Sequence, residues 1–261
     1  MKKMIAVLLV LVMVTAMLAG CGAKKDDALS AIQERGYIIV AMEGCWAPWT
    51  YHDETDELVG FDTEVAAAIA QKLGVEVQYA EGEWDGLFAG LDAGRYDIIV
   101  NGVDLTEDRA AAYNFTDAYA YIRTALVVRG DNEEIAAFED LNGKTTVNSI
   151  GSTYELLAES YGATVQGVDT LDETLELVLQ GRADATLNAE VSIYDYLDQY
   201  PDANIKIVAL TEEASHVCIP MKKDDSTKTL QEAINKAIAE LRADGTLAQL
   251  SQKYFGSNIT E

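Results

Sequence analysis

The sequence predicts an α/β protein built on parallel sheets. Short β-rich runs alternate with amphipathic helical segments along most of the chain, and glycines end several of the helical segments. No low-complexity segment or short repeat interrupts the alternation. Such alternation is typical of parallel βαβ units, and 261 residues leave room for one large or two small domains.

The first half of the chain begins with a β-rich run at 37–42. The segment Thr63–Leu73 carries its apolar residues on one stripe, which predicts a helix, and Gly74 ends it. Thr106 is placed to N-cap a later helix. The other elements expected in this half are a strand at 75–79, a helix at 84–93, a strand at 97–100 and an extended run at 120–128.

A second set of alternating segments starts near Arg129 and repeats the pattern. Strands are expected at 144–147, 164–168, 183–188, 205–210 and 216–221. Helices are expected at 152–161, 171–180, 191–199, 230–243 and 246–254.

The N-terminus is typical of a lipoprotein signal peptide. Lys2 and Lys3 precede an apolar run at 5–19, which is short for a membrane span and ends in the letters LAGC. We expect residues 1–20 to be removed, Cys21 to receive a lipid such as palmitate, and residues 21–28 to form a linker. The alternative is an ordinary transmembrane anchor.

Composition excludes several functional classes. With 44 acidic against 19 basic residues the formal charge is −25, which disfavours nucleic-acid binding. Nucleotide-binding glycine motifs and zinc-protease or serine-hydrolase signatures are absent, and there are only two histidines. We therefore expect no cofactor and no metal. Cys45 and Cys218 make no zinc pattern; a disulfide is chemically possible, but two separate thiols are favoured.

Three segments carry candidate ligand-binding residues, and the first is the loop 43–49. It follows a strand and holds Glu43, Trp46 and Trp49 together with glycine and proline. Two tryptophans in such a loop are costly to expose. They form either a plug in the core or a wall of a pocket.

The second segment, 101–109, leads from the end of a strand into a helix. Strand ends face the crevice of open α/β sheets, and a helix N-terminus attracts anions. Arg109 offers a fork that fits a carboxylate. The alternative is a surface arginine paired with Glu107 or Asp108.

The third segment, 150–154, combines a glycine turn with a hydroxyl-capped helix start. Ser152 and Thr153 lie where an anion would meet free N–H groups. Plain helix capping is the alternative.

Taken in order, these segments resemble the bacterial extracellular solute-binding proteins of family 3, which bind polar amino acids. The resemblance covers about residues 29–256. It rests on LVGFDTEVAAAIAQKLGVEVQYAEGEWDGLFAGLDAGRYDIIVNGVDLTEDR, on YNFTDAYAY and on INKAIAELRADGTLAQLSQKYFG. GSTYELLAESYGATVQGVD and GRADATLNAEVSIYDYL are similar to the branch associated with cystine.

The resemblance implies a two-lobe, hinged periplasmic-binding-protein fold of type II, often called a Venus flytrap. Lobe 1 would comprise 29–120 and 217–261, and lobe 2 would comprise 121–216. It further implies an extracytoplasmic monomer, tethered to the membrane by its lipid, that binds a small amino acid and delivers it to the permease of an ABC importer.

The resemblance also implies roles for individual residues. Trp49 and Trp84 match the aromatic positions that sandwich the ligand side chain. Arg109 matches the arginine that clamps the α-carboxylate, and Thr153 completes that site. The backbone of Asn101 and Gly102 lies where a carbonyl accepts from the α-ammonium.

Two departures from the family pattern concern the ammonium. The usual aspartate of lobe 2 is replaced by Ala189, and Asp104 stands where Ser or Thr is usual. Because a buried ammonium needs a counter-charge, we expect Asp104 to take over that role, with Glu190 as the alternative. A ligand without an α-ammonium, or with additional positive charge, is the rival interpretation.

Two further residues are assigned to the far end of the pocket. Glu43 and Trp46 are expected at the side-chain end of the ligand, with a solvated rim carboxylate as the alternative for Glu43.

The chain is predicted not to be an enzyme. The other candidates are a dehydratase on the same fold, which needs a general acid in the cleft, and a ligand sensor for a membrane receptor.

Overall fold

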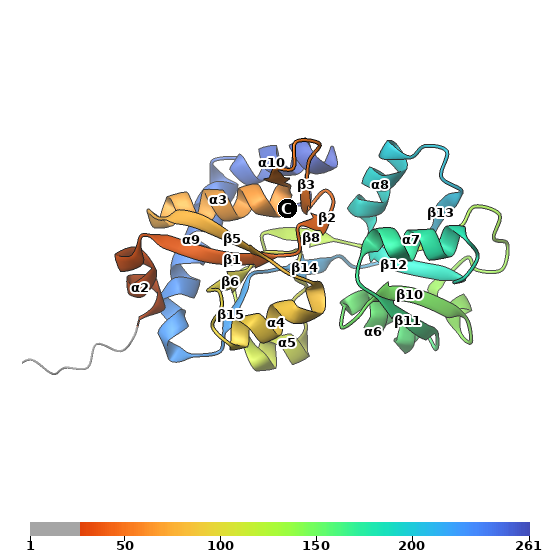
Figure 1. Cartoon of the computed structure of the whole chain (residues 1–261), viewed down its shortest axis with the longest axis horizontal. Helices are drawn as coiled ribbons and strands as arrows, with labels where there is room; N and C mark the ends of the chain where they lie inside the picture. The colour runs from red at the N-terminus through yellow and green to blue at the C-terminus, as the bar shows by residue number, and fades with distance from the viewer. Residues whose placement is uncertain (1–26) are drawn as a thin grey trace, which may run out of the picture.

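The computed structural model describes residues 27–261, which form two α/β lobes lying side by side (Figure 1). The predicted leader and Cys21 lie outside the described residues. We call the elements around sheet β5–β1–β6 lobe 1 and those around sheet β11–β10–β12–β9–β13 lobe 2. No helix within 27–261 has both the length and the apolar character needed to cross a bilayer.

The sheet of lobe 1 is parallel. β1 (Tyr37–Met42) pairs along its length with β5 (Glu76–Glu81), and on its other side with β6 (Ile98–Ile99). The helices of this lobe are α2 (Ala28–Arg35), α3 (Phe61–Leu73), α4 (Trp84–Asp92), α5 (Glu107–Ala112), α9 (Lys228–Ala243) and α10 (Thr246–Phe255).

Two parts of lobe 1 differ from the sequence prediction. Helix α2 begins inside the segment predicted as a linker; Asp27 caps it by accepting from the Ser30 N–H, and only Ile32 is fully buried. The loop after β1 forms an antiparallel meander. Its strands are β2 (Cys45–Trp46), β3 (Thr50–His52) and β4 (Leu58–Val59).

The sheet of lobe 2 is mixed. β10 (Thr145–Ser149) lies between β11 (Thr164–Val168) and β12 (Ala185–Ala189) and is parallel to both. β9 (Thr124–Arg129) and β13 (Ile205–Leu210) extend the sheet in antiparallel fashion. The helices of this lobe are α6 (Thr153–Ser160), α7 (Leu171–Leu179) and α8 (Glu190–Gln199), with a 3-10 turn at Phe138–Leu141.

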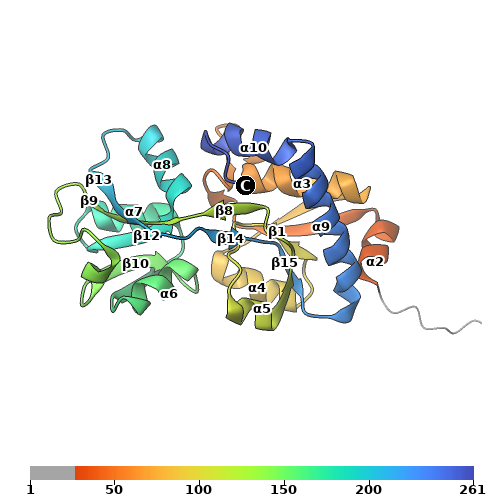
Figure 2. The same ribbon diagram turned by 180° about the vertical axis from the view of Figure 1, so that it is seen from behind.

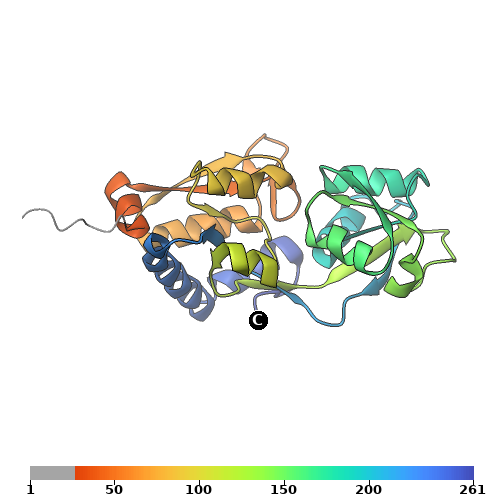
Figure 3. The ribbon, with the colours of Figure 1, turned by 90° about the horizontal axis from the view of Figure 1, so that it is seen from below.

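The chain crosses between the lobes twice. The predicted runs 120–128 and 216–221 each break into two strands, and β8 (Ala120–Ile122) pairs with β14 (Ser215–Val217) at the crossing (Figures 2 and 3). β7 (Tyr113–Phe115) pairs with β15 (Pro220–Lys222) inside lobe 1. The predicted lobe boundaries fall within the β8–β14 pair and stay a prediction.

Candidate ligand-binding site

Elements from both lobes end around one cavity between the two sheets. Its unfilled space is about 450 Å³, including the part open to solvent. The cavity lies beyond the carboxyl ends of parallel strands, as expected for an open α/β sheet. It is lined by Glu43, Trp46, Trp84, Asn101, Gly102, Asp104, Arg109, Ser149, Ser152, Thr153, Tyr154, Leu171 and Asn188.

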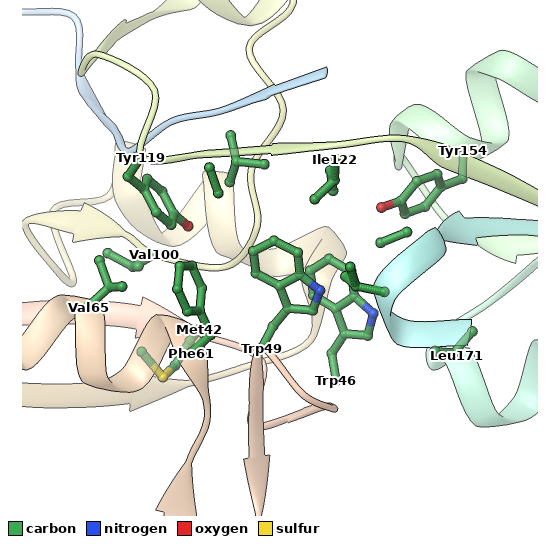
Figure 4. Close-up of a cluster of buried hydrophobic side chains, with 14 of the residues drawn as sticks. Met42, Trp46, Trp49, Phe61, Val65, Val100, Tyr119, Ile122, Tyr154 and Leu171 are labelled. Atoms are coloured by element: carbon green, nitrogen blue, oxygen red, sulfur yellow. The ribbon is translucent and has the colours of Figure 1, made fainter. Parts of the chain in front are cut away.

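One of the two tryptophans in the meander lines this cavity and the other supports it. Trp46 stacks on Trp49 with ring centroids 5.2 Å apart, and Trp49 packs against Phe61 (Figure 4). Trp49 is 0% exposed and also packs against Phe255. Trp49, which the family resemblance places at the ligand, does not line this cavity. Trp49 lies in the core behind Trp46, which takes the wall position.

Gly102 allows the Trp46 ring to lie against the backbone. Its φ is +55°, and a Cβ at this position would lie 2.5 Å from the Trp46 ring. The Gly102 N–H donates to Asp62, which also accepts from the Tyr119 hydroxyl at 2.8 Å. Burial raises the pKa of the Asp62 carboxyl to about 7. Asp62 and Tyr119 thus position the wall of the cavity.

Arg109 is fixed against aromatic rings at the start of α5. Its guanidinium carbon lies 5.2 Å from the Trp84 ring centroid and 5.3 Å from that of Phe88. It donates to the Asp104 backbone carbonyl at 3.0 Å and, across the lobes, to the Gly151 carbonyl at 3.4 Å. Burial lowers its pKa. The guanidinium therefore faces the cavity rather than pairing on the surface, and Trp84 contacts it there.

Asp104 is a buried carboxylate that joins three parts of the chain. Its side chain accepts from the Thr153 hydroxyl of lobe 2 and from Ser215 of β14, the latter at 2.6 Å. Only 6% of the residue is exposed. Burial raises the pKa of Asp104, while the two hydroxyls and Arg109 act to lower it. A cation in the cavity would offset the cost of this buried charge.

Glu43 and Asn101 form a reciprocal pair. The Asn101 side chain accepts from the Glu43 N–H at 2.7 Å and donates to the Glu43 carboxylate at 2.6 Å. Burial raises the pKa of the Glu43 carboxyl to about 7, although the bond from Asn101 opposes this. Glu43 therefore lines the cavity, and a positive group beside it would favour loss of its carboxyl proton.

Lobe 2 contributes neutral groups to the cavity. Ser152 caps α6 by accepting from the Glu155 N–H at 3.1 Å, so the capping alternative is realised at a residue that also lines the cavity. The Asn188 side chain accepts from the Trp46 indole N–H at 3.2 Å, across the lobes. Ser149, Tyr154, Leu171 and Asn188 were not among the residues expected from sequence.

Glu190 is engaged outside the cavity. It holds Arg123, between β8 and β9, through two hydrogen bonds of 3.0 and 2.7 Å, and its backbone N–H donates to the Arg123 carbonyl. The buried Ala189 ends β12 beside it. Among the described residues of lobe 2, no carboxylate lines the cavity, so the structure does not bring Glu190 to the ammonium position.

The charged and polar groups around the cavity suit a small zwitterion. Within residues 27–261, no group of three or more His, Cys, Asp or Glu side chains is placed to hold a metal ion. Cys45 and Cys218 are free thiols, the first exposed and the second buried. The cavity offers a guanidinium and two carboxylates from one lobe, opposite hydroxyl and amide groups from the other.

Comparisons with known proteins agree with this geometry. The family model of bacterial extracellular solute-binding proteins, family 3, matches residues 38–257. The chain is 36% identical to the L-cystine-binding protein TcyA of Bacillus subtilis (strain 168), over 100% of both chains. It is 33% identical to the L-cystine-binding protein TcyJ of Escherichia coli (strain K12), covering 96% of this chain and 95% of the relative.

Solved structures of binding proteins share the fold. An ancestral arginine-binding protein bound to arginine superposes with a TM-score of 0.79 at 35% identity, covering 85% of this chain and 99% of that one. The L-cystine solute receptor of Neisseria gonorrhoeae, in the unliganded open conformation, gives 0.61 at 37% identity, covering 90% and 99%. AncCDT-1, an ancestral amino acid-binding protein and precursor of cyclohexadienyl dehydratase, gives 0.80 at 27% identity, covering 88% and 100%.

Proposed function

The chain belongs to family 3 of the bacterial extracellular solute-binding proteins, and we propose that it binds an α-amino acid between its lobes and delivers it to an ABC importer. The observation that carries this proposal is the cavity in which Arg109 and Asp104 stand on one wall. A guanidinium suits an α-carboxylate, and a buried carboxylate suits an α-ammonium.

Binding would be coupled to lobe closure. Hydrogen bonds that cross the cavity, from Thr153 to Asp104 and from Trp46 to Asn188, exist only when the lobes are together. A ligand that contacts both walls gains its full set of contacts in the closed state and shifts the equilibrium toward it. The importer would then accept the closed form.

The test is a thermal-shift screen of the protein after unfolding and refolding, which removes any ligand carried over. The panel contains the common amino acids and cystine. A ligand at 100 times its dissociation constant stabilises the fold by about 2.7 kcal/mol. A clear shift with an α-amino acid supports the proposal, and silence across the panel contradicts it.

The role of Asp104 is tested by the substitution Asp104→Asn. It keeps the shape and removes the charge; its amide oxygen can accept from one of the two hydroxyls, and its amide N–H can donate to the other. We expect the affinity for an α-amino acid to fall about 10-fold to 100-fold, because the ammonium loses a buried partner. Calorimetric titration measures this, and Asp108→Asn serves as an exposed control. Wild-type affinity in Asp104→Asn would refute the role.

The proposal includes binding without chemical change. A structural neighbour is the precursor of a dehydratase. It must therefore be tested whether Glu43 or Asp104 in the cleft acts as a general acid. Prolonged incubation with the bound amino acid and with prephenate, followed by mass spectrometry, is expected to return both unchanged. Turnover of either compound would overturn this part.

We also propose that Cys21 carries the lipid that tethers a monomeric protein outside the cytoplasm. The support is the sequence around LAGC. Labelling of growing cells with a palmitate analogue is expected to mark the wild type and not Cys21→Ser. Equal labelling of the two would contradict it.

A further inference from the structure

Hydrogen bonds join the two lobes at places away from the crossing strands β8 and β14. In the described part of the chain, the bonds donated by Trp46, Arg109 and Thr153 each involve residues that line the amino-acid cavity. A further bond runs from the Trp49 indole N–H to the Ser192 hydroxyl of α8 at 3.1 Å. Neither of its partners lines the amino-acid cavity. This bond therefore joins the lobes without touching the space for the ligand.

Lobe 1 fixes the direction of the Trp49 N–H. The Trp49 carbonyl accepts from the Asp62 N–H at 2.9 Å, at the start of α3. The ring packs edge-on against Phe61 with centroids 5.7 Å apart, and against Phe255 of α10 at 4.9 Å. Figure 4 shows the indole nitrogens of Trp46 and Trp49 on the same side of the stacked pair, facing lobe 2. Because contacts within lobe 1 already hold the ring, little side-chain entropy is lost when lobe 2 meets this N–H.

Lobe 2 presents Ser192 at the start of a helix that is tied to a crossing strand. Ser192 lies in the first turn of α8, and Glu190 in the same turn holds Arg123 through two hydrogen bonds. Beside Ser192, the meander and the helices α7 and α8 leave an unfilled space of about 800 Å³, including the part open to solvent. The Trp49–Ser192 bond is thus a local contact between the lobes at the edge of a hollow.

The closed form buries both partners of this bond. Trp49 is 0% exposed and Ser192 is 1% exposed. When the lobes part, water can bond to both groups. When the lobes close, each group needs the other, because a buried donor left without an acceptor is more costly than a made hydrogen bond is favourable. Loss of the Ser192 hydroxyl therefore raises the free energy of the closed form and hardly changes that of the open form.

We propose that Trp49 and Ser192 are positioning residues that set the balance between the open and closed forms, whichever amino acid the protein binds. The proposal goes beyond the function proposed above, and only its effect on affinity rests on that function. The apparent affinity scales with the fraction of protein in the binding-competent form. A change in this bond therefore shifts the affinity for every ligand by the same factor, whereas a change in a residue that contacts the ligand alters the preference among ligands.

Small-angle X-ray scattering and calorimetric titration of Ser192→Ala test the proposal. Scattering is measured on the free protein after unfolding and refolding, and titration uses the amino acids that the thermal-shift screen identifies, beginning with cystine and arginine. We expect Ser192→Ala to show a larger radius of gyration without ligand, or an affinity lower by about 3-fold to 10-fold for each ligand alike. The radius responds if the free wild type is mainly closed, and the affinity responds if it is mainly open.

Two further variants separate closure from folding. Ser192→Thr keeps the hydroxyl and is expected to keep the wild-type radius and affinity. Ser160→Ala, an exposed serine at the end of α6, is the matched control. A lower melting temperature of Ser192→Ala with unchanged radius and unchanged affinity would overturn the proposal, as would a loss of affinity confined to one ligand. The scattering needs no ligand, so the closure contact and the proposed function can fail separately.

Discussion

The two lobes bring different chemistry to the same cavity. Lobe 1 supplies its acidic and basic lining residues, Glu43, Asp104 and Arg109, and anchors them against aromatic rings and amides. Lobe 2 supplies hydroxyls, an amide, a tyrosine and a leucine. All the charged side chains that line the cavity therefore come from one lobe. The other lobe completes the site with neutral donors and acceptors upon closure.

Removing the cation of lobe 1 should have the largest effect. In Arg109→Met the α-carboxylate loses a buried partner, and we expect affinity for the amino acid to fall at least about 100-fold. Calorimetric titration measures the loss. Arg95→Met, an exposed arginine of the same lobe, is the control. A loss of affinity below 5-fold in Arg109→Met would contradict the idea that lobe 1 supplies the charged contacts to the ligand.

The pH dependence should come from lobe 1 as well. The free protein holds a proton on Glu43 up to a pKa of about 7, and a bound positive charge favours loss of that proton. Affinity for a cationic ligand should therefore rise about 10-fold as pH rises from about 5.5 to about 7.5, and level off above that range.

Two controls accompany this pH prediction. Glu43→Gln should flatten the profile, and an unchanged profile in that variant would assign the titration to another group. The free energy of unfolding without ligand should change with pH in the opposite direction to the affinity. Between the ordinary glutamate pKa of 4.5 and the raised value of about 7, the native state holds a proton that the unfolded chain has lost. This carboxyl therefore lowers the free energy of unfolding as pH rises through that range.

Loss of a neutral group of lobe 2 should cost less. Thr153→Val removes the hydroxyl that donates to Asp104 across the lobes, and we expect about a 5-fold loss of affinity. Thr164→Val, an exposed threonine on β11 at the edge of the lobe 2 sheet, is the control. A loss as large as that of Arg109→Met would show that lobe 2 carries the recognition.

The carboxylate of lobe 2 that pairs with the crossing strand should matter least. Glu190→Gln weakens the bond to the half-exposed Arg123, and pairs of this kind contribute little. We expect a change in affinity below about 3-fold, measured by the same titration. A loss above 10-fold would place Glu190 at the ammonium after all.

The elements of the fold were more predictable than their contacts. The stripe of α3, the glycine after it and the Thr106 cap of α5 are local signals, and all three hold in the structure. Helix α2 was missed because only Ile32 of its short length is fully buried. Family resemblance, rather than periodicity, supplied the two lobes.

The site was predictable where chain position decides it and not where packing decides it. Asn101, Gly102 and Arg109 follow a strand end, so sheet topology alone brings them to the cavity. Whether Trp46 or Trp49 faces the ligand depends on the β2–β3 meander, which the sequence does not reveal. Asp62 reads as an ordinary acidic residue at a helix start, and only the structure shows it buried.

The most direct test is the crystal structure of the complex with the amino acid that the screen identifies. We predict the α-carboxylate on the Arg109 guanidinium and the α-ammonium within hydrogen-bond distance of Asp104, with lobe 2 contacting these groups through uncharged atoms only. An ion pair between the ligand and a lobe 2 carboxylate, such as Glu190 released from Arg123, would contradict the division of chemistry between the lobes.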